Sequence, residues 1–525
     1  MKRKLGAQLS HMLRDRGVDV IFGIPGVHNQ EMYRGIEEAG IRHILARHEQ
    51  GAGFMADGYA RASGNPGVSY VITGPGLCNI MTAMGQAYSD SVPMLVLSSC
   101  LDETSERRGQ LHQMLDQRAA ADTVCDWSQE ARSADAAYGL IERAFDEFEV
   151  SRPRPKHLQV PIALLESESE EAPFPNLPAQ RTTAGTPDVT PVTSLLNIAK
   201  RPLFILGGGS TDVIWRPLLE PLGIATITSF AGRGTVGHKY PLDFGSCLIR
   251  EIGKEVIASA DLVVAIGCEL AEVDMWRREL GHTATLVRVD LDPEVLSDHQ
   301  RATIKIQADT DSFARAFWEE TKSRKPAKGW TEEEVAEARR KARAEVEAEY
   351  PRLTRICDAL RDAMPLDAMI YSDMTQFAYV AKEVWDMDRS GHWHHPTGFG
   401  TLGYALPAAI GGAVARPGKP TVAIAGDYGF QYTLQELGTA AELGQPLPII
   451  LWDNGKLKAI EDSMVGAQIA PNAVIALNPD FCKLAEAYGA ASARPGSLAE
   501  MQEALRTALR HPAPTLIHVT SDIAD

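Results

Sequence analysis

Short apolar runs alternate with amphipathic segments along most of the chain. Continuous apolar runs of this length are typical of strands in parallel sheets, which helices cover on both faces. The pattern therefore predicts an α/β protein with three doubly wound parallel-sheet domains. The expected strands span residues 18–24, 68–72, 94–98, 202–207, 261–267, 285–290, 368–372, 421–426 and 446–453.

Two segments of different composition separate the three blocks of strands. Residues 166–190 are acidic and then rich in Pro and Thr, which is the composition of a linker. Residues 323–350 begin as a basic linker and become highly charged, so a solvated helix that bridges two domains is predicted there. The predicted domains are residues 1–165, 191–322 and 351–525, and the first and third share a similar rhythm of strands and helices.

The composition of the chain argues against nucleic-acid and membrane partners. Among the 525 residues, 52 Lys and Arg face 69 Asp and Glu, and the net charge of −17 argues against a nucleic-acid partner. Neither an apolar stretch approaching 18 residues nor the apolar core of a signal peptide is present, so no membrane association is expected. The seven cysteines form no CxxC pair and are typical of reduced thiols. We expect a cytoplasmic enzyme that acts on a small molecule.

The most informative pattern lies in the third block, where two strands each end in an oxygen-bearing side chain. Asp427 follows one strand, Tyr428 and Gly429 are expected in a turn, a helix over 430–443 comes next, and the following strand leads to Asn454. The carboxyl ends of parallel strands meet at one edge of a sheet, so Asp427 and Asn454 are expected side by side. Oxygen ligands suit Mg²⁺, and backbone N–H groups at the turn suit a diphosphate.

This arrangement resembles the diphosphate-binding motif of thiamine-diphosphate enzymes. The resemblance implies that Mg²⁺ is bound by Asp427, Asn454 and the main-chain carbonyl of Lys456. Asn454 lies 27 positions after Asp427. It also implies that the three domains are pyrimidine-binding, central and diphosphate-binding, in that order. In the first domain, Glu49 matches the carboxylate that contacts the aminopyrimidine ring of the cofactor. Small residues follow Glu49 on its predicted helix and permit the close helix approach that a subunit interface requires.

Three further stretches resemble the same family: FGIPGVHN, TGPGLCN and GFGTLGYALPAAIGGA. In the third stretch, Leu402 takes the place of the apolar side chain that holds the cofactor in a V shape. The resemblance implies cofactor contacts by Pro25, Asn79, Gly400, Leu402, Tyr428 and Gly429, with Thr375 and Gln376 near the diphosphate.

The resemblance also implies a reaction. Glu49 would bind N1′ of the pyrimidine, the 4′-imine would take the C2 proton, and the resulting ylide would attack a 2-oxo acid. After CO₂ leaves, the enamine would be protonated to an aldehyde or captured by a second carbonyl. Non-oxidative decarboxylation is the first hypothesis, and a carboligase of acetolactate synthase or benzaldehyde lyase type is the alternative. The family implies active sites between subunits, hence a homodimer or homotetramer.

Two residues are expected to act near the reacting carbon. Carboligating relatives carry a histidine at the position of His28, and Gln113 matches a glutamine that contacts the reacting adduct. An ordinary histidine at the start of a helix is the alternative for His28. His112 is expected near the substrate. Pyruvate decarboxylases have a histidine pair there, and only one member is present in this chain.

The segment after Asn454 is predicted to form a helix over the active site and to select the substrate. The runs GDYGFQYTLQEL and DSMVGAQIAPNAVIALNPDF resemble 5-guanidino-2-oxopentanoate (2-ketoarginine) decarboxylases, and Ser463 stands where biosynthetic acetolactate synthases have Trp. Glu461 and Asp462 could pair with a guanidinium, or could be two solvated carboxylates. A regulatory protein that binds the cofactor without turnover is a third hypothesis, and the intact cofactor motifs argue against it.

Two other patterns are not expected to carry chemistry. The spacing of His392, His394 and His395 fits neither a helix face nor a zinc pattern. The glycines at 207–209 begin a G-x-G-x-x-G pattern that Asp212 leaves incomplete. FAD occupies the central domain of acetolactate synthases, but it is not expected here.

Overall fold

The structure is a computed structural model that describes residues 1–102, 107–174, 186–475 and 477–523. The chain divides into two compact units. The first unit comprises Met1–Arg181, Met369–Thr375 and His395–Asp525, and the second comprises Thr182–Ala368 and Gln376–His394. Part of the predicted linker, residues 175–185, lies outside the described residues. Across the described ranges, every helix is too short or too polar to cross a bilayer.

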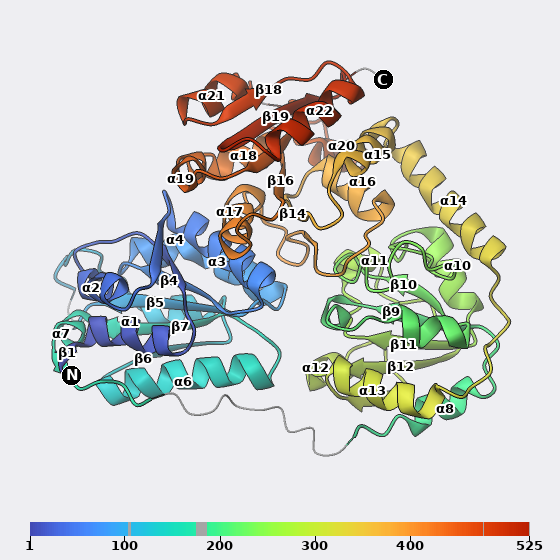
Figure 1. Cartoon of the computed structure of the whole chain (residues 1–525), viewed down its shortest axis with the longest axis horizontal. Helices are drawn as coiled ribbons and strands as arrows, with labels where there is room; N and C mark the ends of the chain where they lie inside the picture. Colours follow the sequence, from blue (N-terminus) through green and yellow to red (C-terminus); the bar gives the residue numbers. More distant parts are fainter. Residues whose placement is uncertain (103–106, 175–185, 476, 524–525) are drawn as a thin grey trace. The chain divides into compact units, whose positions relative to one another are not determined.

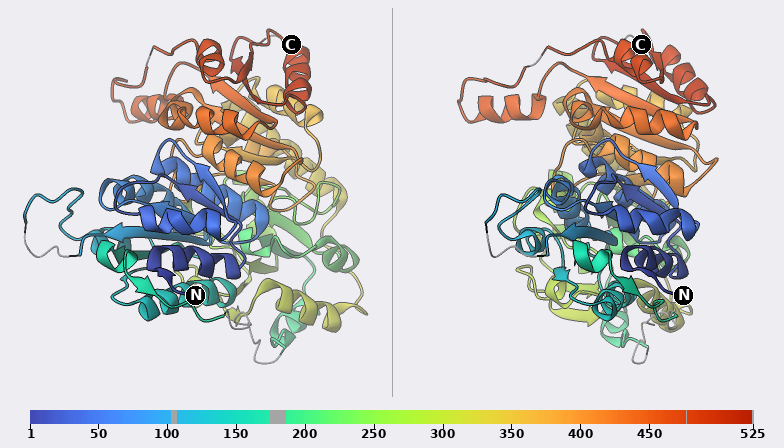
Figure 2. Two further views of the ribbon diagram at one scale, coloured as in Figure 1. Left: turned by 60° about the vertical axis from the view of Figure 1, so that its left-hand side comes forward. Right: turned by 90° about the vertical axis from the view of Figure 1, so that its left-hand side faces the viewer.

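The N-terminal part of the first unit is a parallel sheet with helices on both faces (Figures 1 and 2). Its strands follow the order β3–β2–β4–β5–β7–β6. Apolar residues alternate between the faces, since Ile21 packs with α1, α2 and α6, whereas Phe22 packs with α3 and α4. The elements are α1 (Leu5–Asp15), β2 (Val20–Gly23), α2 (Gln30–Glu38), β3 (Arg42–Leu45), α3 (Glu49–Ser63), β4 (Gly67–Val71), α4 (Pro75–Ser89), β5 (Met94–Cys100), α5 (Gln117–Asp122), β6 (Trp127–Glu130), α6 (Ala134–Val150), β7 (Lys156–Pro161) and α7 (Ile162–Leu165).

The first residues of the predicted linker belong to this part of the structure. β8 (Glu168–Ser169) pairs antiparallel with β1 (Arg3–Lys4) next to the sheet. The regular structure of the first unit therefore extends past residue 165.

The C-terminal part of the first unit repeats the same plan. Strands β14, β16, β17, β19 and β18 lie in that order and are parallel, which matches β2, β4, β5, β7 and β6 of the first sheet. The similar rhythm of the first and third blocks thus reflects a similar topology. The elements are β14 (Met369–Ser372), α17 (Ala405–Ala415), β16 (Thr421–Gly426), α18 (Asp427–Thr433), α19 (Glu436–Leu443), β17 (Leu447–Asp453), α20 (Lys458–Gly466), α21 (Phe481–Ala487), β18 (Ala491–Ala493), α22 (Leu498–Ala508) and β19 (Pro514–Thr520).

Helix α3 packs closely against α17 of the same chain. A Cβ atom at Gly58 would lie 2.0 Å from the carbonyl oxygen of Ala408, and one at Gly411 would lie 1.9 Å from that of Met55. Only residues without a side chain permit this approach. The small residues after Glu49 therefore make, within one chain, the close contact that was expected of a subunit interface.

The second unit is built on a third parallel sheet, with the order β10–β9–β11–β12–β13. The three sheets confirm the predicted fold class. The glycine-rich loop after β9 packs against its neighbour, because a Cβ atom at Gly207 would lie 2.1 Å from the carbonyl oxygen of Gly267. The elements are α8 (Thr190–Leu196), β9 (Pro202–Leu206), η1 (Gly208–Ser210), α9 (Arg216–Leu219), η2 (Glu220–Leu222), β10 (Ala225–Thr228), α10 (Glu251–Ser259), β11 (Leu262–Ile266), α11 (Glu272–Met275), β12 (Thr285–Asp290), α12 (Pro293–Leu296), β13 (Ile304–Gln307), α13 (Thr310–Thr321), α14 (Glu332–Glu349), α15 (Leu353–Ala363), α16 (Gln376–Val384) and β15 (Trp393–His394).

Two predicted helices differ from the structure. Helix α14 is charged but not fully solvated, because Val335, Ala338 and Val346 are buried on one of its faces. The helix expected over 430–443 consists of α18 and α19, and α18 begins at Asp427. The turn expected at Tyr428 and Gly429 is therefore wrong, since both residues are helical.

Candidate functional site

Two neighbouring strands bring the predicted cation ligands to one edge of the C-terminal sheet. β16 and β17 are parallel neighbours, and Gly426 pairs with Trp452 at their carboxyl ends. Asp427 follows β16 directly, while Asp453 is the last residue of β17 and precedes Asn454. The structure thus places the Asp427 and Asn454 positions at adjacent strand ends, as the spacing predicted.

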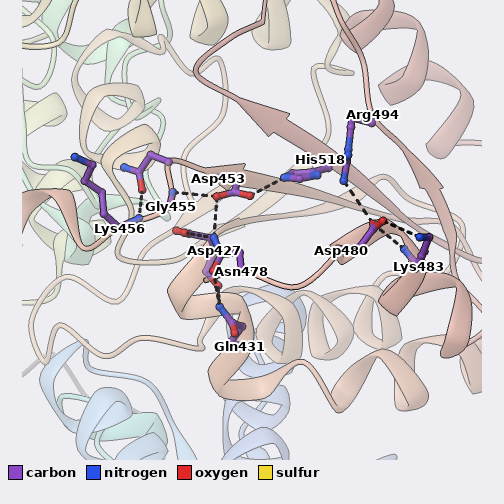
Figure 3. A network of polar contacts seen from close by, with 11 residues as sticks. Asp427, Gln431, Asp453, Gly455, Lys456, Asn478, Asp480, Lys483, Arg494 and His518 are labelled. Carbon is purple, nitrogen blue, oxygen red and sulfur yellow. Dashed lines mark hydrogen bonds and ion pairs between the residues drawn. The ribbon is translucent and has the colours of Figure 1, made fainter. Parts of the chain in front are cut away.

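A third side chain joins these strand ends (Figure 3). Nδ2 of Asn478 donates to Oδ2 of Asp427 at 2.7 Å and to Oδ1 of Asp453 at 2.9 Å. On the other side of Asp453, Nε2 of His518 in β19 donates to Oδ2 at 2.8 Å. Asp453, Asn478 and His518 were not predicted as site residues. Asp453 directly precedes Asn454 but is not itself a motif ligand, and Asn478 and His518 lie in later segments that no spacing rule ties to Asp427.

The two carboxylates differ in their electrostatic environment. Burial raises the pKa of Asp427, the hydrogen bond from Asn478 opposes that rise, and the nearby charge of Asp453 adds to it. The hydrogen bond from His518 holds the pKa of Asp453 below its usual range. A cation bound beside Asp427 would offset both the burial and the repulsion, so this oxygen-rich edge fits a hard divalent ion.

The turn after β17 is held by bonds between its backbone N–H groups and two side-chain oxygens. The N–H of Gly455 donates to Oδ1 of Asp453 at 3.0 Å, and the N–H of Lys456 donates to Oδ1 of Asn454 at 3.3 Å. Gly455 has a φ of +67°, a conformation that favours glycine. Asp453 therefore fixes the turn that presents Asn454 and the Lys456 carbonyl.

Asp373, at the end of β14, lies beneath this edge and was also missed. It accepts the backbone N–H groups of Met374 and Gly403, each at 2.9 Å, and burial raises its pKa to about 6. A Cβ atom at Gly429 would lie 2.4 Å from its Oδ2, which explains why α18 has glycine there. Thr375 is close to the end of β16, since a Cβ atom at Gly426 would lie 2.9 Å from the Oγ1 atom of Thr375.

The loop that contains Gly400 and Leu402 lies beside α18. Gly400 has a φ of +68°, and the carbonyl oxygen of Gly403 accepts the hydroxyl of Thr433 at 2.8 Å. Leu402 is partly buried in this loop. Gln376 belongs to the second unit, so its place near the diphosphate stays a prediction.

The expected pyrimidine-side residues gather at the edge of the N-terminal sheet. Glu49 is the first residue of α3, is only 8% exposed, and accepts Nδ2 of Asn79 at 2.8 Å through Oε2. A Cβ atom at Gly76 would lie 3.4 Å from its other oxygen. Pro25 is exposed in the loop after β2. The structure thus joins Glu49 and Asn79 directly.

His28 and His112 come together although they lie far apart in the sequence. Their ring centroids are 4.9 Å apart in an edge-to-face arrangement. Burial lowers the pKa of His28, and the proximity of His112 lowers it further. His112 also reaches the glycine loop before α4, since a Cβ atom at Gly74 would lie 2.5 Å from its carbonyl oxygen. Gln113 accepts the backbone N–H of Gln110 at 3.3 Å.

The predicted substrate-binding carboxylates lie on α20, a helix without buried residues. Glu461 forms an ion pair with Nζ of Lys456 at 3.0 Å, and its side chain is 18% exposed. Asp462 pairs with Lys458, and its side chain is 54% exposed. Both carboxylates therefore have lysine partners from the same segment.

Two histidines of the HWHHP segment, His392 and His395, contact residues at the start and the end of the β14 segment. Nδ1 of His395 lies 2.9 Å from the Ser372 hydroxyl, and Nδ1 of His392 lies 3.2 Å from the Ala368 carbonyl.

Within one chain, Glu49 and the contact made by Tyr404 lie at different places along α3. The Tyr404 hydroxyl, two residues after Leu402, donates to Asp57 at 2.6 Å. Asp57 lies eight residues after Glu49, which is about 12 Å along a helix that rises 1.5 Å per residue. Tyr404, which follows the Leu402 loop, therefore contacts α3 about two helical turns away from Glu49.

Comparison with known protein families settles the classification. The models for the thiamine pyrophosphate enzyme N-terminal, central and C-terminal domains match residues 3–120, 189–317 and 373–519. The chain belongs to the thiamine pyrophosphate enzyme family. This confirms the resemblance stated above, since thiamine pyrophosphate and thiamine diphosphate are the same compound.

Curated members of this family resemble the chain over nearly its full length. The probable 2-ketoarginine decarboxylase AruI of Pseudomonas aeruginosa is 41% identical over 526 residues, which cover 98% of this chain and 93% of that protein. The large subunit of acetolactate synthase isozyme 1 of Escherichia coli is 27% identical over 549 residues, which cover 99% of this chain and 94% of that protein. The large subunit of isozyme 2 from the same organism is 27% identical over 536 residues, which cover 98% of this chain and 95% of that protein.

Proposed function

We propose that this family member requires thiamine diphosphate and Mg²⁺ and decarboxylates a 2-oxo acid non-oxidatively, with 2-ketoarginine as the candidate substrate. The observation that carries the proposal is the meeting of Asp427, Asp453 and Asn454 at adjacent strand ends. The similarity to the probable 2-ketoarginine decarboxylase, at 41% identity, supports the substrate class.

The chain offers a consistent set of groups for the cofactor. The Asp427 carboxylate, the Asn454 amide oxygen and the Lys456 carbonyl would hold Mg²⁺, because hard oxygen ligands suit this ion. The start of α18, at Tyr428 and Gly429, would contact the diphosphate. Thr375 would join them, since it lies against Gly426 at the end of β16.

When bound, thiamine diphosphate supplies a thiazolium that accepts the electrons released as CO₂ leaves the substrate. The role of the protein is to place and orient the reacting groups. Glu49 would contact the aminopyrimidine ring, and its bond to Asn79 fixes one carboxylate oxygen so that the other can face the ring. Leu402 would support the bent conformation of the cofactor.

The contact between His28 and His112 supports a proton-transfer role near the reacting carbon. A histidine whose pKa lies below its usual value is neutral at physiological pH, so it can accept a proton and return it. Gln113 lies next to His112 and would contact the substrate.

Recognition of a guanidinium by Glu461 and Asp462 is the proposed basis of substrate choice. Arginine-like groups bind carboxylates in a planar, bidentate manner. Lys456 and Lys458 already pair with these carboxylates. The substrate would therefore replace a lysine partner, and the less exposed Glu461 would contribute more than Asp462.

We further propose that the active site forms between two subunits, in a homodimer or homotetramer. The separation between Glu49 and the Tyr404 contact with Asp57 along α3 supports this arrangement, because Tyr404 lies two residues after Leu402. A cytoplasmic location is proposed from the seven free cysteines, which suit a reducing compartment.

A product assay tests the function. The purified protein, supplied with thiamine diphosphate and Mg²⁺, is offered 2-ketoarginine and pyruvate separately. Release of CO₂ and 4-guanidinobutanal from 2-ketoarginine alone supports the proposal, whereas acetolactate from pyruvate contradicts it.

A carboligase is the second candidate, and one observation favours it. His28 and Gln113 match residues of carboligating relatives, and the structure brings His28 to His112 beside Gln113. Acetolactate formation in the same assay would select this candidate.

A further inference from the structure

The amide of Asn478 bonds two carboxylates at once, one from each of two neighbouring strand ends (Figure 3). Nδ2 lies 2.7 Å from Asp427 and 2.9 Å from Asp453. Asn478 itself belongs to neither strand, because it lies between α20 and α21. A segment that follows the proposed substrate helix therefore reaches back to the edge that would bind the cation.

We propose that Asn478 is a positioning residue that holds Asp427 and the 453–456 turn in the arrangement that binds a divalent cation. The inference rests on the cation site of the proposed function and deepens it. It names a side chain that sets the affinity of the site through the orientation of Asp427 and Asp453.

The chemistry of an asparagine side chain suits this role. Two carboxylates at adjacent strand ends repel each other, and N–H donors between them offset that repulsion before a cation arrives. An amide nitrogen has two N–H donors and no charge. A lysine at this position would also bind both carboxylates, but its positive charge would compete with the cation.

The surroundings of Asn478 fix its orientation. Its Oδ1 accepts Nε2 of Gln431 at 3.2 Å, and the same nitrogen donates to the Asp427 carbonyl at 3.0 Å. Because the amide oxygen faces Gln431, the amide nitrogen must face the carboxylates. Two residues later, the Asp480 side chain accepts the N–H of Lys483 and caps the start of α21, which anchors the segment.

The bond network continues beyond the carboxylates. Asp453 is held on its far side by His518, and it accepts the N–H of Gly455 within the turn that leads to Lys456. Asn478 and His518 therefore bond the two carboxylate oxygens of Asp453, one each. Partners that orient metal ligands in this way commonly change metal affinity by about 10–100-fold when they are removed.

The test measures Mg²⁺ affinity rather than activity alone. Binding of thiamine diphosphate to the full chain is followed by calorimetry at increasing Mg²⁺ concentration, which gives a half-saturating Mg²⁺ concentration. We expect Asn478→Ala to raise this concentration by about 10–100-fold. Asn478→Ser keeps one donor and should give a smaller increase.

Two comparisons separate positioning from a general structural role. Asn472→Ala is the matched control, because Asn472 is exposed in the same segment and bonds only the local Ala470 carbonyl among the described residues. It should leave the half-saturating Mg²⁺ concentration unchanged. For Asn478→Ala, saturating Mg²⁺ should restore kcat to within about twofold of wild type, which a merely structural defect would not allow.

The outcomes are distinct. An Asn478→Ala variant that needs no more Mg²⁺ than wild type, even if its melting temperature falls, overturns the role of Asn478 and leaves the cation site standing. A wild-type chain whose cofactor binding is independent of Mg²⁺ overturns the cation site itself, and this inference with it.

Discussion

The carboxylate of Glu436 accepts the backbone N–H of His48 at 3.0 Å, and His48 immediately precedes Glu49. The same carboxylate accepts the N–H of Arg47 and the hydroxyl of Thr439. Glu436 is fully buried at the start of α19, and the contact is possible because Gly51 has no side chain in the way. A residue of the C-terminal domain thus fixes the start of the helix that carries Glu49.

This contact predicts a pH dependence of stability. Burial raises the pKa of Glu436 to about 7, above the value of 4.5 expected in an unfolded chain. Because the folded state binds the proton more tightly, this group favours folding below pH 4.5, and that contribution is lost as the pH rises through 7. A pKa shift of this size contributes on the order of 3 kcal/mol to the free energy of unfolding at low pH. Glu436→Gln keeps an acceptor for both N–H groups and removes the titration.

Thermal unfolding at pH 5 and pH 8 checks this prediction. The wild-type melting temperature should fall between the two values by more than that of Glu436→Gln. Glu442→Gln is the matched control, since Glu442 lies on the same helix and pairs with Arg47 at the surface. Equal pH dependence in wild type and Glu436→Gln would show that Glu436 does not carry the effect.

The sequence indicated the fold and the linear motifs because each of these depends on local patterns. Apolar runs identified the strands, and β12 has the predicted bounds of 285–290. Asp427 and Asn454 were found because their spacing equals one strand–helix–strand unit. Asp453, Asn478 and His518 were missed since their meeting depends on three segments that only the folded chain brings together.

Other differences arise from packing that a linear pattern does not contain. Helix α18 begins at Asp427, and Gly429 in its first turn lies against Asp373, which follows another strand, β14. The glycines of α3 indicated close packing, but their sequence does not specify the partner, which is α17. Likewise, the sequence left open whether Glu461 and Asp462 are solvated, and it did not specify that Lys456 and Lys458 pair with them.

The histidine pair predicts a particular shape of the rate profile. His28 has a lowered pKa, so the acid limb of CO₂ release should lie below pH 6.5. His112→Gln removes one of the causes of that lowering and should move the limb upward, toward 6.5. The measurement is kcat/KM for 2-ketoarginine between pH 4.5 and 8. A limb that stays in place in His112→Gln, or persists in His28→Gln, would rule out His28 as its source.

The proposed guanidinium contact predicts a selective effect on substrate binding. Glu461→Gln should raise KM for 2-ketoarginine by about 10-fold or more, because a charge-assisted hydrogen bond is lost. Asp462→Asn is the control on the same helix, and its greater exposure should keep the change within about twofold. Steady-state kinetics measure both variants. Similar small changes in the two variants would mean that neither carboxylate binds the guanidinium.

Sharing of the active site between subunits predicts that two inactive variants complement each other. Glu49→Gln removes the pyrimidine contact and Asp427→Asn removes a cation ligand, so each alone should lose at least about 100-fold in CO₂ release while keeping its melting temperature. When both are co-expressed with different tags, random pairing places the two variants together in half of the dimers. One site of each mixed dimer then carries both changes, and the other carries none.

The mixture should therefore recover about a quarter of wild-type activity if Glu49 and Asp427 of one site come from different chains. If both came from the same chain, every site would carry one change and no activity would return. Purification by the two tags in sequence isolates the mixed dimers, whose activity should reach about half of wild type. The 12 Å or so along α3 between Glu49 and the contact of Asp57 with Tyr404 favours the first result.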